Sequence, residues 1–174
     1  MRTRNTFTML IICILLALTI VMGVNVYETS AQYTRSDCRR ALAGTYLYTA
    51  NVGNLGSFRG IITLAQDGNI FTTASIQGTG APPISQPFGD QQGSWKCISE
   101  RESISTVLNF NYPTATSPGS ITRADTRATF NPKAGTIQGT TTGRTFALTA
   151  NPLTEDAPIS GTFNFTGQRV EPQQ

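Results

Sequence analysis

The chain of 174 residues contains no histidine. Imidazole is the usual base beside a catalytic serine or cysteine and the commonest metal ligand, so its absence excludes the familiar histidine-dependent hydrolases and metal sites. The sequence also has no spaced Cys/Asp/Glu cluster for a metal, no phosphate-cradling glycine loop and no nucleophile elbow. We therefore expect a protein that carries no metal or cofactor, and whose function is binding rather than catalysis.

Charged residues are scarce as well. Only 13% of residues are charged, and the net charge of +3 falls to +2 once Arg2, Arg4 and Glu28 near the amino terminus are left out. The remaining basic residues are scattered and form no stripe, so the sequence predicts no nucleic-acid partner. Threonine, serine, glycine, asparagine and glutamine are abundant instead, which is typical of the surface of an exported β protein.

One long hydrophobic run lies near the start of the chain. Arg2 and Arg4 precede an unbroken apolar segment over 9–22, and small and polar residues follow it. Cations followed by an apolar run of this length are typical of an export signal. We expect everything after this segment to lie outside the cytoplasm, in a secreted or periplasmic protein or on the outer face of the membrane.

This leader has two interpretations. As a cleaved signal peptide over 1–31, it places Thr29 and Ala31 at the −3 and −1 positions. As an uncleaved anchor over 7–26, it supplies the roughly 20 residues that span a hydrocarbon core, and membrane contact is confined to this segment. The shortness of the dense apolar run favours cleavage. The rest of the chain divides into an extension over 32–43, a folded domain over 44–170 and a tail over 171–174.

Two cysteines lie beyond the leader, Cys38 and Cys97. In an oxidising compartment an even pair favours a disulfide, which here closes a loop of about 60 residues and stabilises the fold by roughly 4 kcal/mol in the chain-entropy estimate. The alternative is a pair of buried free thiols, which pack as small apolar side chains. A catalytic thiolate is not expected, because no histidine is available to activate it.

Beyond the leader the hydrophobic pattern has a period of two, and no amphipathic helix is evident. Alternation of this kind places one face of each strand in a core and the other in water. From 103 to 112 the apolar face contains Ile104, Leu108 and Phe110, opposite serines and asparagines. From 159 to 165 the face that we expect to point inward contains Ile159, Gly161, Phe163 and Phe165.

Turn residues divide this pattern into about nine short strands. Asp67-Gly68 is typical of a two-residue hairpin turn, and 131–135 and 142–144 contain further turn residues. Short strands joined in order by turns, with no helices between them, predict an all-β fold, an antiparallel up-and-down barrel of about eight to ten strands. The expected strands span 44–50, 57–66, 69–77, 93–99, 103–112, 121–130, 136–142, 144–150 and 158–166.

A glycine, one polar residue and an aromatic residue recur three times, as Gly44-Thr45-Tyr46, Gly93-Ser94-Trp95 and Gly161-Thr162-Phe163. Glycine relieves crowding where a strand bends, and the aromatic residue two positions later points to the same face and fills the interior. These motifs predict three aromatic side chains inside the barrel.

The first motif resembles the signature of the lipocalin-like (calycin) barrels, in which an arginine near the last strand packs over the aromatic residue of the first strand. Tyr46 and Arg169 stand at the corresponding ends of this domain. The stretch over 58–68, followed by Gly93-Ser94-Trp95, also resembles a group of exported bacterial barrels of that kind. The resemblance implies an apolar interior and a small hydrophobic ligand. This chain departs from the family because its tryptophan lies in mid-chain and no C-terminal helix follows the last strand.

The barrel interior and its mouth hold the candidate binding residues. Small inward side chains on the strand over 121–130 leave room for a ligand unless aromatic neighbours fill it. On the other face of that strand, Arg123 and Arg127 form an ordinary charge ladder if exposed, or a site for an anionic head group if turned inward. The candidate contacts for an apolar ligand are Tyr46, Tyr48, Phe58, Ile84, Phe88, Trp95, Leu108, Phe110 and Phe163.

The segment over 78–92 is the longest irregular stretch of the domain. Loops of about 15 residues inside a compact domain are often lids or binding loops. Ile84 and Phe88 are suitably placed to fold over a barrel mouth. The alternative is a surface connection with no partner.

These observations together predict an exported, non-catalytic barrel that binds or carries a small hydrophobic ligand. The first alternative is a structural or adhesive envelope protein without a small-molecule ligand, whose outer strand faces contact a partner. The second is a barrel isomerase or cyclase that uses Tyr46, Tyr48, Tyr112 and Glu100. The oligomeric state is not defined by the sequence.

Overall fold

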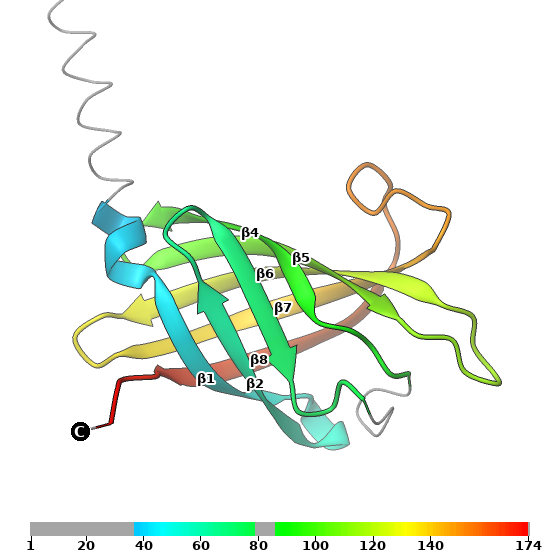
Figure 1. The fold of residues 1–174 in the computed structure, drawn as a ribbon, viewed down its shortest axis with the longest axis horizontal. Coiled ribbons are helices and arrows are strands. Elements are labelled where there is room, and N and C mark those ends of the chain that lie inside the picture. Colours follow the sequence, from blue (N-terminus) through cyan, green and yellow to red (C-terminus); the bar gives the residue numbers. More distant parts are fainter. Residues whose placement is uncertain (1–36, 79–85, 174) are drawn as a thin grey trace, which may run out of the picture. The chain divides into compact units, whose positions relative to one another are not determined.

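The computed structural model describes residues 37–78 and 86–173, which form a closed barrel of eight antiparallel strands (Figure 1). Each strand pairs with the next along the chain, and β8 pairs with β1 to close the sheet. The predicted all-β antiparallel barrel is therefore confirmed, with eight strands. They are β1 (Gly44–Asn51), β2 (Ser57–Leu64), β3 (Asn69–Ala74), β4 (Gln91–Ser99), β5 (Glu102–Asn111), β6 (Ser120–Asn131), β7 (Thr136–Ala147) and β8 (Ile159–Arg169).

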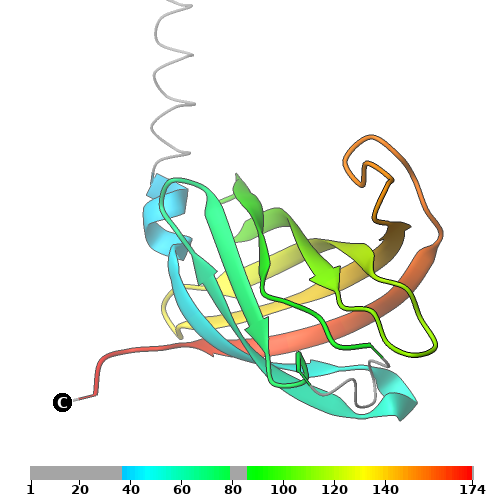
Figure 2. The same ribbon diagram turned by 45° about the vertical axis from the view of Figure 1, so that its right-hand side comes forward.

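The barrel has two unlike ends, which lie at opposite sides of both ribbon views (Figure 2). At the end that we call the helix end, a short helix over 37–42 precedes β1, and the hairpins over 65–68 and 132–135 lie beside it. At the other end, which we call the loop end, the strands are joined by longer connections. One of them contains the 3-10 helix η1 (Gly53–Leu55), two run over 112–119 and 148–158, and the connection from β3 to β4 is described only in part.

The predicted turn at Thr142-Gly143-Arg144 is wrong, because β7 runs without interruption through these residues. Gly143 pairs with Ala124 on one side and with Gly161 on the other, so the glycine sits inside a central strand. Glycine in a strand often marks a local irregularity rather than a turn. Here a register shift lies beside it, between β7 and the start of β8.

That shift explains why Ile159 is not in the core. Along most of β8, Phe163 and Phe165 face inward as predicted, and they pair with Thr141 and Gly139. At the bulge, Arg144 pairs with Ile159, which moves the first residue of β8 to the outer face, where it is 59% exposed. An extra residue in one strand reverses the alternation beyond it.

The predicted hairpin at Asp67-Gly68 is present but has a three-residue loop. Ala65 donates a 2.9 Å hydrogen bond from its backbone N–H to Asn69, and the Gly68 N–H donates one of 3.1 Å to the Ala65 carbonyl. Gly68 has a φ of 99°, whereas Asp67 does not enter the positive-φ region. This is the geometry of a turn followed by a left-handed glycine, a common alternative to the two-residue loop.

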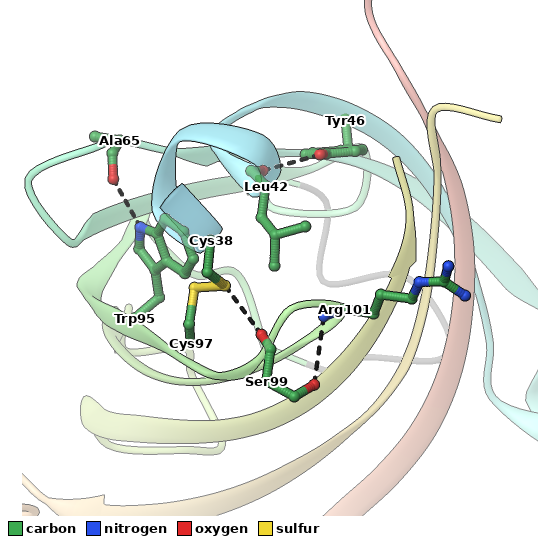
Figure 3. The surroundings of a disulfide bond; sticks show 8 residues. All are labelled: Cys38, Leu42, Tyr46, Ala65, Trp95, Cys97, Ser99 and Arg101. Carbon is green, nitrogen blue, oxygen red and sulfur yellow. Dashed lines mark hydrogen bonds between the residues drawn. A yellow bond between two sulfur atoms is a disulfide. The ribbon is translucent and has the colours of Figure 1, made fainter. Parts of the chain in front are cut away.

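The N-terminal helix over 37–42 covers the helix end of the barrel. Leu42 is fully buried, and its carbonyl accepts a 2.9 Å hydrogen bond from the Tyr46 hydroxyl (Figure 3). Cys38 forms the predicted disulfide with Cys97 of β4, 59 residues away in the chain. The helix is thus tied covalently to the barrel wall. A disulfide pair of this kind indicates a location outside the cytoplasm.

The first and last strands meet under the side chain of Arg169. Its guanidinium lies 5.7 Å from the centre of the Tyr46 ring and donates a hydrogen bond to the Ala43 carbonyl. Gly44 allows this contact, because a Cβ there would lie 2.7 Å from the guanidinium nitrogens. A cation over an aromatic face at this distance is attractive, so Arg169 adds a side-chain contact to the backbone pairing of β1 with β8.

The leader over 1–31, with either its cleavage or its anchoring, lies outside the described residues. Within 37–78 and 86–173 no helix has the length and apolar character needed to cross a membrane.

Candidate binding cavity

A cavity of about 590 Å³ occupies the half of the barrel interior that faces the loop end. This volume is within the range of small-molecule binding sites. All eight strands contribute to its lining, together with Val52 and Leu55 after β1 and Gln86 and Phe88 before β4. The walls differ in chemistry from one side of the barrel to the other.

Aromatic rings form the wall made by the neighbouring strands β8, β1 and β2. The Tyr48 ring centre lies 6.2 Å from that of Phe58 and 5.6 Å from that of Phe165, and Phe58 lies 5.6 Å from Phe163. All three pairs are edge-to-face, the arrangement that aromatic quadrupoles favour. The rings therefore support one another as a preformed apolar surface.

Two glycines make room for these rings, one on β2 beside β1 and one on β7 beside β8. Gly60 is paired with Tyr48, and a Cβ on Gly60 would overlap the end of the tyrosine ring. Gly139 is paired with Phe165, and a Cβ there would lie 2.8 Å from the phenyl ring. Any larger residue at either position would displace the ring from its place, so these glycines fix the shape of the aromatic wall.

Amide and hydroxyl side chains form the opposite wall, on β3 to β6. The Thr72 hydroxyl donates to Gln91 Oε1 over 3.2 Å, Gln91 Nε2 donates to Asn109 Oδ1 over 3.2 Å, and Asn109 Nδ2 donates to Asn111 Oδ1 over 3.0 Å. Asn111 Nδ2 then donates to hydroxyls of β6. Each member has at least one hydrogen-bond partner, which offsets much of the cost of burying these polar groups.

The cavity lining contains no Asp, Glu, Lys or Arg among the described residues. Of the described residues in the lining, Tyr48 alone has an ionisable side chain. Burial raises the pKa of the Tyr48 hydroxyl, and a hydrogen bond with Thr72 opposes part of this shift. The phenol therefore stays neutral throughout the ordinary pH range, and so does the cavity.

Of the predicted ligand contacts, four line this cavity: Tyr48, Phe58, Phe88 and Phe163. Phe88 is 5% exposed and its backbone bridges to Asn111, so the described part of the long loop reaches back to the barrel as the sequence suggested. Ile84 lies outside the described residues.

Tyr46 and Trp95 are inside the barrel, as predicted, but not in the cavity. Each is 3% exposed and packs in the helix end. The Trp95 indole N–H donates a 2.8 Å hydrogen bond to the Ala65 carbonyl. Tyr46 lies edge-to-face with Phe130, their ring centres 5.7 Å apart. They are core residues that close one end of the barrel.

The prediction that Leu108 and Phe110 line the interior is wrong. Both point outward from β5, and Phe110 is 61% exposed. The inner face of β5 is the one with Val107 and Asn109, which are both 4% exposed. Phe110 instead pairs with Ile121 on the outer surface. Polar side chains can face the cavity here because Gln91, Asn109 and Asn111 are linked by hydrogen bonds.

Arg123 and Arg127 likewise point outward, so the prediction that they form an internal site for an anionic head group is wrong. Arg123 Nε donates to Asp125 over 3.1 Å, its Nη1 donates to the Pro152 carbonyl over 2.6 Å, and its guanidinium lies over Phe146. It anchors the 148–158 connection to the barrel wall. Arg127 pairs with Glu102 on the outer surface.

The four residues of the isomerase hypothesis do not share a site. Tyr48 lines the cavity, Tyr46 is packed in the helix end, and Tyr112 is 52% exposed on the surface. Glu100 is exposed in the turn between β4 and β5 at the helix end.

The polar wall is the part of the site that the sequence analysis missed. Its core is the chain from Gln91 to Asn109 and Asn111. The sequence contains one signal for it: Asn109 and Asn111 flank Phe110, so the two amides share one face of a strand. That face is expected to contact solvent, because amide side chains are usually exposed.

No protein-family model, curated protein or solved structure matches this chain. Among the residues that the structure describes, no group of three or more His, Cys, Asp or Glu is placed to hold a metal ion.

Proposed function

We propose that this protein is an exported, non-catalytic barrel that binds or carries a small, largely apolar molecule in the cavity of its loop end. The observation that carries the proposal is the unfilled volume of about 590 Å³ behind a wall of packed aromatic rings. Small barrels without a ligand usually fill their interior with side chains.

The likeness to lipocalin-like barrels is part of this proposal. The contact of Arg169 with Tyr46, the glycine that admits it, and the helix that covers one end before β1 all support it. The Cys38–Cys97 disulfide supports export to a secreted or periplasmic location, because such bonds persist in oxidising compartments.

The experiment compares ligand binding before and after the cavity is filled. N-phenyl-1-naphthylamine, a neutral probe whose fluorescence rises in apolar surroundings, is titrated into the folded, disulfide-bonded protein. We expect saturable binding that Ala124→Phe abolishes, because Ala124 lines the cavity, and that Thr129→Phe preserves, because Thr129 faces outward on the same strand. Native mass spectrometry of protein from its source would identify a co-purified ligand. No saturable binding, or equal binding in both variants, would overturn the proposal.

The adhesive alternative has one observation in its favour, a hollow of about 1010 Å³ on the outer surface. It is lined by basic, acidic and hydroxyl side chains, among them Lys96, Asp125 and Thr140. Substitution of outward residues there, for example Thr140→Glu, would abolish partner binding under this alternative and leave probe binding in the cavity unchanged.

A further inference from the structure

We propose that the ligand is an uncharged molecule with two unlike sides: a flat apolar side that packs on the aromatic wall, and an edge of hydroxyl, amide or ether groups that hydrogen-bond with the amide wall. This inference rests on the proposed function, because it names the chemical class of molecule that the same cavity accepts.

The charge of the ligand follows from the lining. An ionised group that enters a buried site without a partner loses its hydration and gains no opposite charge. The described lining offers neither a cation for a carboxylate, sulfonate or phosphate nor an anion for an amine. Arg123 and Arg127 of β6 are paired with Asp125 and Glu102 on the outer face, and Arg144 of β7 is paired with Asp125 and Asp156. Ligands whose ionised group would have to enter the cavity, such as a fatty-acid anion bound with its carboxylate inside, are therefore disfavoured.

The polar edge follows from hydrogen-bonding capacity that the described residues leave unused. A side-chain amide has two N–H donors and an oxygen that accepts twice. Gln91 and Asn109 each donate one amide N–H to the next member of the chain, so each retains one N–H that no other described residue accepts. Both residues line the cavity. A ligand with acceptor groups along one edge would satisfy these donors.

The two walls face each other across the barrel. In a closed ring of eight strands in sequence order, β5 lies opposite β1. Asn109 and Asn111 belong to β5, whereas Tyr48 belongs to β1 and Phe58 and Phe165 to its two neighbours. A bound molecule therefore meets rings on one side and amides on the other. Aromatic faces favour flat apolar partners, and the amides orient the molecule about its long axis.

The first test uses a matched pair of probes on the wild-type protein. N-phenyl-1-naphthylamine and 8-anilino-1-naphthalenesulfonate share one ring system and differ by a sulfonate. We expect the neutral probe to bind at least ten-fold more tightly than the sulfonate at pH 7.5. Only the fluorescence signal that is lost in Ala124→Phe is counted as binding in the cavity. Equal or tighter cavity binding of the sulfonate would overturn the inference while leaving the proposed function intact. If neither probe binds, both this inference and the proposed function are overturned.

The second test concerns the polar edge. 2-Naphthamide and 2-methylnaphthalene, which have similar shapes, are compared as competitors of the fluorescent probe. We expect the amide to be preferred, and Gln91→Leu to reduce this preference about five-fold, the effect of losing one hydrogen bond. Gln92→Leu is the matched control, because Gln92 is the next residue of β4 and faces outward. A preference for the methyl compound in the wild type, or an equal preference in both variants, would rule out a polar edge.

Discussion

In the half of the interior beneath the N-terminal helix, Tyr46, Trp95 and Phe130 are each 3% exposed and fill the space between the strands. In the half toward the loop end, the same strands enclose a cavity of about 590 Å³. Alternation along each strand is the same in both halves, so it determines only which side chains point inward. The size of those side chains determines whether the interior is filled.

The strand β6 passes from the cavity to the filled half of the interior within four residues. Ala124 and Ala128 both face inward and both belong to the core cluster, but of the two only Ala124 lines the cavity. On the neighbouring strand β5, Ser105 and Asn109 also place small or polar side chains along the cavity. The filled half and the cavity thus lie at opposite ends of one barrel, and the following predictions test that division.

The largest expected effect is from Trp95→Ala in the filled half. The substitution removes a buried indole and its hydrogen bond to Ala65, and should lower the free energy of unfolding by about 3–5 kcal/mol. Urea denaturation of the oxidised protein measures it. Phe110→Ala is the control, because that ring is 61% exposed and its loss should change the stability by no more than about 0.5 kcal/mol. A larger effect at Phe110 than at Trp95 would contradict the inward and outward assignments.

Removal of the disulfide should have the next largest effect. The double substitution Cys38→Ser, Cys97→Ser opens a link between residues 59 apart and should cost about 2–4 kcal/mol, measured by urea denaturation. Because the link lies at the helix end, the folded variant should retain the cavity and its affinity for N-phenyl-1-naphthylamine. Loss of probe binding under conditions where the variant is folded would show that the two ends are not independent.

The two alanines of β6 give the sharpest comparison between the halves. Ala128→Phe inserts a ring into a packed region and should destabilise the fold by about 1–3 kcal/mol. Ala124→Phe inserts the same ring beside the cavity and should cost less than about 1 kcal/mol, since the cavity has room for it. Thermal or urea unfolding of both variants distinguishes them. Equal destabilisation would mean that the loop-end half is as tightly packed as the helix end.

The smallest effect concerns alkaline pH. Burial raises the pKa of Tyr48 in the folded state, so the unfolded chain loses this proton first as the pH rises. Stability should therefore be fully present below pH 10 and should fall as the pH rises above about 10 toward the raised pKa. Burial also raises the pKa of Tyr46, which adds to the fall. Unfolding curves at pH 9 and pH 11 should show a smaller fall in Tyr48→Phe than in the wild type, and an undiminished fall would contradict the assignment.

Much of the fold was predictable because it depends on local alternation and on turn residues. The strands and the hairpins at 65–68 and 131–135 follow from these signals. The ninth strand was wrong because Gly143 has the composition of a turn, whereas its pairing with Ala124 and Gly161 keeps it within β7. Whether such a glycine ends a strand or lies within it depends on its pairing with other strands. That pairing cannot be inferred from one sequence alone.

The candidate site was predictable only on its aromatic side. Tyr48, Phe58 and Phe163 follow from the rule that apolar side chains face inward. The same rule misplaced Phe110, since Asn109 and Asn111 occupy the inner face of β5. Buried amides are stable there because their partners come from β4 and β6, the strands paired with β5 on either side. The register of these pairings, which the alternation within one strand does not give, brings the partners together.

Both ends of the described chain leave the barrel at the helix end: the segment that enters β1 and the residues after Arg169 (Figure 1). An affinity tag, a dye or a solid support attached to the tail that follows Arg169 is therefore separated from the cavity by the filled half of the barrel. Immobilisation through that terminus would leave the loop end facing the solution, so ligand libraries can be screened on a chip without masking the entrance.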